Sequence, residues 1–171
     1  IDFEVIDARD RKWQCATIQL DYQLPERFDL TYVGSDNTLH RPVVIHRAIF
    51  GSLERFMAIL VEHYAGDFPV WMAPEQVRVL TVSEKSVPYG QEVVAALEAA
   101  GVRVHFDDRD HRAGAKIREA HNAKTPYMAV IGERDAENRT VAVKSRADGD
   151  LGDVSLDAFV ERVRGELGAP F

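Results

Sequence analysis

A histidine, a glycine and an arginine lie close together in residues 41–56, at a spacing that suits nucleotide binding. The apolar run Val43–Ile45 is typical of a strand, and His46 follows it. Gly51 permits a tight turn, after which apolar residues recur at helical spacing. Arg55 lies off that apolar stripe, so its guanidinium is free to face a cleft. A planar cation beside a close-approach glycine suits a polyphosphate or an adenine ring.

A second polar set lies on the strand predicted over residues 13–22. Its members are Gln14, Cys15, Thr17 and Gln19. Strict alternation along a strand would place Gln14 and Gln19 on opposite faces. Either a bulge lies between them or one of them points away from the site. The plainer interpretation of the whole set is an edge strand that faces water.

Both segments resemble signature sequences of class II aminoacyl-tRNA synthetases. Arg47-Ala-Ile-Phe-Gly-Ser-Leu-Glu-Arg55 resembles the third motif of that class, and the form with His46 ahead of it resembles threonyl-tRNA synthetases. Trp13-Gln-Cys-Ala-Thr-Ile-Gln-Leu-Asp21 agrees, although the family usually has glycine at Ala16. The resemblance extends almost to the C-terminus, through the domain that reads the anticodon.

The resemblance implies roles for residues of the first half. Arg55 is the arginine that packs on ATP, which Mg²⁺ accompanies, and Gln19 is expected beside it as a catalytic residue. The residues expected to bind ATP or the adenylate are Gln14, Cys15, Thr17, Gly51, Ser52 and Arg55. His46 is one of three ligands of a Zn²⁺ that binds the threonine amino and hydroxyl groups, and the family's other two ligands lie upstream.

Taken without the resemblance, these residues have plainer interpretations. Arg55 would be a surface arginine paired with Glu54 or Glu62, and His46 a satisfied core histidine.

Charged residues also gather in the second half, where a strand is predicted to lead into a helix. By resemblance they form the face that holds the anticodon, with Arg or Lys on guanine edges and phosphates and a carboxylate on a base amino group. The expected residues are Arg109, Lys116, Arg118, Asp135, Lys144 and Arg146, with Arg112 in the same cluster. The plainer interpretation of each one is a solvated surface charge.

Two domains with different patterns are expected, residues 1–72 and residues 73–171. The first is α+β, part of the class II antiparallel sheet with its third-motif helix, with strands near 3–7, 13–22, 28–34 and 41–47 and a helix over 52–65. The second is α/β in the order βαβαββα, a mixed sheet flanked by helices. Its strands are expected at 77–82, 102–106, 127–131 and 140–144, the last two joined by a polar hairpin, and its helices at 89–100, 113–122 and after Ser155.

Composition narrows the function classes. The 171 residues are 46% hydrophobic and 29% charged, as in an ordinary globular protein, and no apolar run reaches membrane-helix length. One cysteine excludes a disulfide framework and favours a reducing compartment, which predicts a cytoplasmic protein. A net charge of −7 argues against general nucleic-acid binding but allows a local basic patch.

These observations predict a threonine–tRNA ligase, which activates threonine with ATP and transfers it to tRNA. The longer parent protein is expected to be a homodimer, with tRNA, ATP and threonine as partners. A strand predicted directly after Ile1 suggests a chain cut within a domain, so this C-terminal fragment is expected to be inactive alone. The alternative is a non-catalytic RNA-binding or adaptor protein derived from a synthetase anticodon-binding domain.

Overall fold

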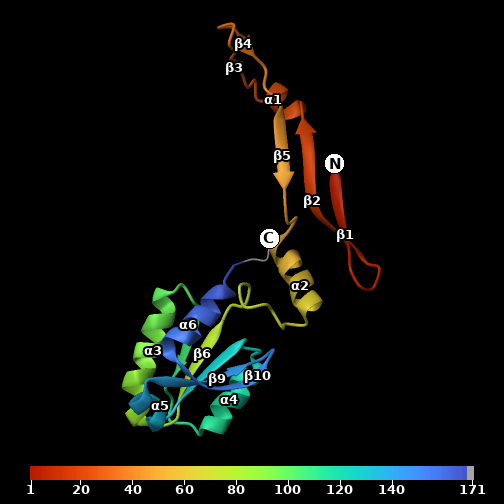
Figure 1. The fold of residues 1–171 in the computed structure, drawn as a ribbon. Helices are drawn as coiled ribbons and strands as arrows, with labels where there is room; N and C mark the ends of the chain where they lie inside the picture. The colour runs from red at the N-terminus through yellow and green to blue at the C-terminus, as the bar shows by residue number, and fades with distance from the viewer. Residues whose placement is uncertain (169–171) are drawn as a thin grey trace. The chain divides into compact units, whose positions relative to one another are not determined.

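The computed structural model describes residues 1–168, and the chain divides into two compact units, residues 1–64 and the part from residue 65 onward (Figure 1). The segment 65–72 belongs to the second unit because cationic side chains of that unit hold its carbonyls. Lys124 donates to the Ala65 carbonyl at 2.6 Å, and Arg146 donates to that of Phe68 at 2.6 Å. The compact units therefore divide between residues 64 and 65.

The first unit is a three-stranded antiparallel sheet followed by one helix. The sheet has the order β1-β2-β5, with β1 Asp2–Ile6, β2 Lys12–Asp21 and β5 Val44–Ala48, and the helix α2 covers Leu53–Tyr64. Between β2 and β5 lie the short helix α1 (Gln23–Arg27) and the small hairpin of β3 (Tyr32–Val33) and β4 (Leu39–His40).

Helix α1 was not predicted from the sequence, and the strand expected over 28–34 is reduced to Tyr32–Val33. The carboxylate of Asp21 explains the turn into α1. It accepts hydrogen bonds from the amides of Gln23 at 2.8 Å and Leu24 at 3.0 Å, which starts a helical turn at the end of β2.

Strand β2 contains a bulge, one of the two arrangements expected from the positions of Gln14 and Gln19. Phe3 of β1 pairs with Ala16, but the next residue, Glu4, pairs with Gln14, so Cys15 is the extra residue. Gly51, with φ +68°, lies against this bulge: a Cβ built on it would come within 3.2 Å of the carbonyl oxygens of Gln14 and Cys15. The start of α2 therefore depends on a glycine at this position.

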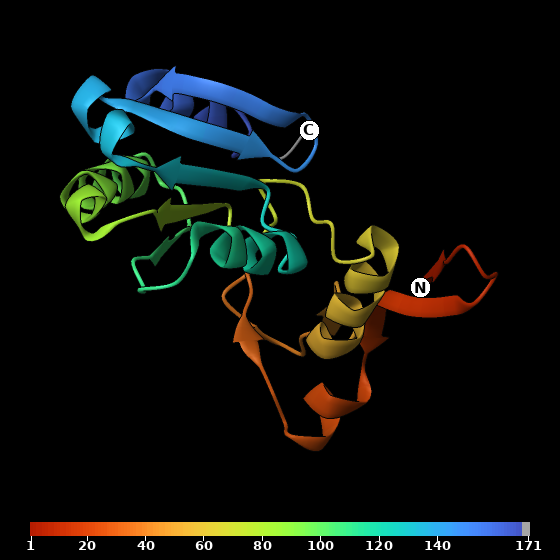
Figure 2. The ribbon, with the colours of Figure 1, turned by 90° about the horizontal axis from the view of Figure 1, so that it is seen from below.

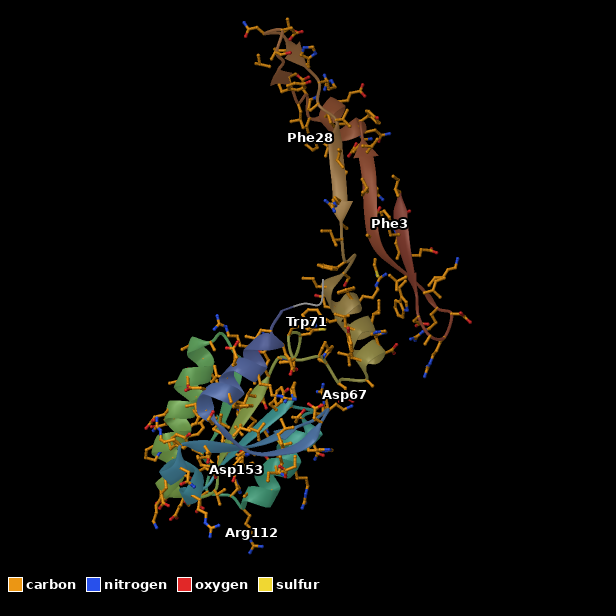
Figure 3. The ribbon with its side chains drawn as sticks, in the orientation of Figure 1. Phe3, Phe28, Asp67, Trp71, Arg112 and Asp153 are labelled. Atoms are coloured by element: carbon orange, nitrogen blue, oxygen red, sulfur yellow. The ribbon has the colours of Figure 1, made fainter. Side chains whose placement is uncertain are left out.

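The first unit buries very little. Within residues 1–64, all of which the structure describes, the buried residues are Cys15 and Pro25. Phe3 remains 51% exposed and Phe28 69% exposed, and both project from the ribbon in Figure 3. A cavity of about 670 Å³ lies between the β1–β2 turn and α2. Arg11 links the turn to the helix, because it forms ion pairs with Asp7 of the turn and Glu62 of α2. Apolar faces of this unit are left uncovered.

The second unit is a five-stranded mixed sheet with helices on both faces, as expected. The strand order is β10-β9-β8-β6-β7. Strands β7, β6 and β8 are parallel, β9 is antiparallel to β8, and β10 is antiparallel to β9. The strands are β6 Val77–Thr81, β7 Val104–Asp107, β8 Tyr127–Ile131, β9 Thr140–Ser145 and β10 Gly149–Ser155. The helices are α3 Val87–Ala99, after the one-turn η1 Glu84–Ser86, α4 Ala113–Asn122, α5 Glu133–Asn138 and α6 Leu156–Gly165.

Two apolar layers hold this sheet. Helices α3 and α6 cover one face, where Val93, Leu97 and Phe159 pack on Val79 and Val143 (Figures 1 and 2). Helix α4 covers the other face, and its Ala120 packs on Leu80 and Met128. Among residues 1–168, no helix is long and apolar enough to cross a membrane.

The mixed α/β class is confirmed, but two elements of the second unit were missed. β8 and β9 pair antiparallel, as a hairpin requires, but the polar connection expected between them is wrong because it forms helix α5. The Asp135 carboxylate accepts from the Gly132 amide at 2.8 Å, and acidic residues fill the first helical turn. Strand β10 was missed because Gly149 and Gly152 disfavour a strand in sequence terms. The N-cap at Ser155 is confirmed by its bond from the Ala158 amide.

A buried lysine joins α4 to the ends of two strands. Lys116 is 1% exposed, and its ammonium donates to the carbonyls of Thr81 at 2.8 Å and Asp107 at 3.1 Å. The Asp107 carboxylate, also buried, lies 4.0 Å from that ammonium and accepts two hydrogen bonds from Arg109. These bonds fix the turn from β7 into α4.

Replacing Gly51 with alanine is expected to destabilise the first unit. The left-handed φ alone costs roughly 1–2 kcal/mol for a residue with a Cβ, and contact with two carbonyl oxygens adds to this. Hydrogen exchange of the β2 and β5 amides measures the effect. Gly101→Ala is the matched control, because Gly101 has φ +83° and nothing within 4 Å of its built Cβ. Since Gly101 lies in the second unit, hydrogen exchange of the β6 and β7 amides measures the effect of the control. An equal loss of stability in both variants would contradict the close approach.

The stability of the second unit is expected to fall in acid through Asp107. Hydrogen bonds from Arg109 lower the pKa of this carboxyl in the folded chain. The ionised form therefore stabilises the fold above the unfolded pKa of about 3.9, and this contribution is lost as pH falls through the lowered folded pKa. Urea unfolding between about pH 6 and about pH 3, followed by circular dichroism, should show a shallower fall for Asp107→Asn than for wild type. The exposed control Asp153→Asn should follow wild type.

Candidate functional site

One face of the first sheet collects most of the polar residues singled out in sequence. Thr17, Gln19 and Asp21 alternate along β2 and therefore share a face. Gln19 pairs with His46 of β5, and directly opposed residues point to the same side. Gln14 joins this face because it donates to Asp2 at 2.9 Å, and Asp2 pairs with Thr17. The bulge thus brings the two glutamines to one side.

His46 is held on this face by Asp21. Its Nε2 lies 2.8 Å from the Asp21 carboxylate, and the side chain is exposed, so the interpretation of a core histidine is wrong. The amide of Leu24 and then the imidazole of His46 lower the pKa of Asp21. A carboxylate that orients an imidazole is the usual second partner of a metal-binding histidine. Nothing in the sequence marked Asp21 for this position.

The residues present do not complete a metal site by themselves. Within residues 1–168 no group of three His, Cys, Asp or Glu side chains converges as a metal requires. His46 offers one ligand, whereas a catalytic zinc takes three protein ligands.

The start of α2 presents Ser52 and Arg55 next to the bulge. The Ser52 hydroxyl accepts from the Arg55 amide at 3.4 Å and donates to Glu54 at 2.8 Å, while Glu62 binds Arg11. The plainer interpretation, an arginine engaged by Glu54 or Glu62, does not hold, and the Arg55 side chain is exposed.

The Thr17 hydroxyl is a further sign of a ligand on this face. Its Oγ1 is buried and has no hydrogen-bond partner among the described residues. A buried hydroxyl without a partner costs stability, which a polar group bound to this face would restore.

In the second unit the structure brings some predicted residues to one face of the sheet. Lys144 of β9 pairs with Met128, whose side chain packs under α4, so Lys144 lies on the α4 face. It bonds to Asp150 of β10 at 2.5 Å. Arg118 is exposed on α4, and Arg112 projects from its start in Figure 3. Arg109 is half-exposed beside them.

Three other predicted residues are engaged within the fold. Lys116 is buried under α4 with its ammonium on two carbonyls, so it is not a surface cation. Arg146 donates to the carbonyls of Lys124 and Phe68, holding the segment that leads into β6. Asp135 caps α5 through the Gly132 amide. Sequence alone shows their charge, but burial and backbone partners depend on the tertiary fold.

Two carboxylates of this face were missed. Asp107 and Glu119 both bind Arg109, at 2.7 and 2.6 Å. Glu119 directly follows Arg118, and Asp107 lies two residues before Arg109. This proximity to predicted arginines was the one feature of the sequence that could have indicated the two carboxylates.

Comparisons with known proteins agree with these two units. The family described as "tRNA synthetase class II core domain (G, H, P, S and T)" matches residues 1–64, and the family described as "Anticodon binding domain" matches residues 76–166. The threonine–tRNA ligase of Acetivibrio thermocellus is 60% identical over 163 residues, 95% of this chain and 26% of the relative. That of Clostridium tetani is 53% identical over 167 residues, 98% of this chain and 26% of the relative.

A solved structure agrees as well. The RNA-binding domain of threonyl-tRNA synthetase from Cryptosporidium parvum Iowa II superposes with a TM-score of 0.83 at 37% identity, over 99% of this chain and 43% of that one. The chain spans about a quarter of the length of the curated relatives named above. It belongs to the threonine–tRNA ligase family of class II aminoacyl-tRNA synthetases, with residues 1–64 in the class II core domain and residues 76–166 in the anticodon-binding domain.

Proposed function

We propose that this chain forms the C-terminal part of an enzyme that activates threonine with ATP and transfers it to tRNA. The observation that carries the proposal is the presence of both family domains, in order, within a chain 60% identical to a threonine–tRNA ligase. The first unit would contribute to aminoacyl-adenylate formation, and the second would hold the anticodon. The active enzyme would be a longer, homodimeric protein located in the cytoplasm.

The polar face of β2 and the start of α2 would bind the nucleotide and the adenylate. Gly51 leaves the backbone open beside Cys15, and Ser52 orients the first turn of α2 toward the same bulge. Arg55 would pack on ATP and hold adenine and triphosphate in line, with Mg²⁺ neutralising the phosphates. Gln14, Gln19 and Thr17 would supply hydrogen bonds to the aminoacyl-adenylate or the terminal ribose.

His46 would be one zinc ligand in the longer protein, with the remaining ligands supplied from outside these 171 residues. When bound, the zinc would recognise the amino and hydroxyl groups of threonine. The contact of His46 with Asp21 supports this role, since it fixes the imidazole on the polar face.

The α4 face of the second unit would receive the anticodon. Arg109, Arg118 and Lys144 would contact bases or phosphates, and Asp135 lies at the start of α5 near the end of β8. Lys116 and Arg146 would act indirectly, by holding α4 and the segment before β6 in place. Unstacked anticodon bases suit recognition by arginine planes and polar side chains.

A second candidate is RNA binding without catalysis. It is favoured by the uneven burial: the described core lies almost entirely in the second unit, which could therefore bind RNA by itself.

The 171-residue chain alone is not expected to activate threonine. The first two class II motifs are absent from its sequence. Threonine-dependent exchange of pyrophosphate into ATP should stay at the background level of a chain carrying Arg55→Ala. Exchange above that background would contradict this expectation.

The chain is nevertheless expected to discriminate tRNAs by their anticodon. A tRNA with a threonine anticodon should bind more tightly than one with altered anticodon bases, and the preference should persist at raised salt. Lys144→Ala should reduce the preference by about 1–3 kcal/mol, as loss of one base contact does. Arg164→Ala is the control, because that exposed arginine lies on α6 at the opposite face. Equal binding of both tRNAs that disappears with salt would count against an anticodon reader.

A further inference from the structure

Arg109 differs from the other exposed cations of the α4 face because two carboxylates fix its position. Its Nε donates to Asp107 Oδ1 at 2.8 Å, and one terminal nitrogen donates to Asp107 Oδ2 at 2.7 Å. The same terminal nitrogen donates to Glu119 Oε2 at 2.6 Å. The Asp107 side chain is fully buried, whereas the Arg109 side chain is 47% exposed. One edge of the guanidinium is therefore anchored, while about half of the side chain remains accessible to solvent.

The charges of this cluster cancel. Asp107 and Glu119 carry two negative charges, and Arg109 and Lys116 carry two positive charges, with Lys116 4.0 Å from Asp107. Attraction of a phosphate depends on uncompensated positive charge and on release of counterions. A guanidinium that already has two carboxylate partners is a weak phosphate ligand, although its planar surface and its fixed orientation are retained.

Arg118, on the same helix, has the opposite character. It is exposed, and within residues 1–168 it forms no ion pair. Its charge is therefore available to a phosphate, and its side chain has no anchor that fixes a plane. The two arginines stand nine positions apart and provide a comparison within one surface.

We infer that Arg109 is a stacking platform for an unpaired base of bound RNA, and that Asp107 and Glu119 are positioning residues that hold it. Single-stranded bases stack on arginine planes as they do on aromatic rings. An arginine fixed beforehand loses less side-chain freedom when the base arrives. This inference rests on the proposed anticodon-binding function and names how one residue of that surface acts.

The test measures binding of the 171-residue chain to a fluorescent anticodon stem–loop RNA, carrying a threonine anticodon, over a series of salt concentrations. Arg109→Ala should weaken binding about 5- to 150-fold, the range for one stacked base, without changing the slope of log affinity against log salt. Arg118→Ala should instead reduce the steepness of that slope by about 0.7, the value for one phosphate contact on a single strand.

Two variants separate stacking from charge and from folding. Arg109→Lys keeps the positive charge beside Asp107 but has no plane, so it should bind as weakly as Arg109→Ala. Glu119→Gln, at a half-exposed position, should weaken binding in the wild-type background and have no further effect when combined with Arg109→Ala. Thermal unfolding of each variant checks that the second unit stays folded.

Full affinity in Arg109→Lys, or a slope in Arg109→Ala reduced as in Arg118→Ala, would overturn the stacking role. Unchanged affinity in Arg109→Ala would overturn any contact with RNA at this residue. Failure of the proposed function gives a different result, because the unaltered chain would then not distinguish the threonine anticodon from altered ones.

Discussion

The burial of one lysine ammonium organises the second unit. Lys116 reaches through the base of α4 to the carbonyls of Thr81 and Asp107, at the ends of the neighbouring strands β6 and β7. Removing an ammonium from water is costly, and here the cost is offset by two carbonyls and the nearby Asp107 carboxylate. The same carboxylate fixes Arg109, so the position of the helix, the turn before it and the exposed guanidinium all depend on one buried contact.

The first unit is organised by backbone contact instead. A bulge at Cys15 brings Gln14 to the face of Gln19, and Gly51 fits against that bulge because it has no side chain. This joins two motifs separated by more than thirty positions in sequence into one polar face. Its apolar faces remain open, in keeping with a chain that spans about a quarter of the length of its relatives.

Both units contain cations that hold the fold and cations that remain exposed. In the second unit, arginines and lysines serve mainly to hold the fold: Arg146 holds the carbonyl of Phe68, and Arg103 holds those of Trp71 and Ala73. In the first, Arg55 remains exposed at the start of α2. Residue type therefore says little about whether a cation is structural or functional, because the deciding factor is how many internal acceptors lie within its reach.

The sequence by itself determined the family through the resemblance of two motifs. It also determined the class of both domains and most of the element order, because hydrophobic periodicity and glycine positions act over short ranges. It also located the polar set on β2 and the Ser155 helix start, which depend on neighbouring residues. Only the tertiary structure decided that Lys116 is buried, that Arg146 is engaged by carbonyls and that Asp21 holds His46. It likewise revealed α5 in place of a hairpin. Each of these features depends on partners far away in sequence or on burial by packed elements, and neither can be predicted from the local sequence pattern.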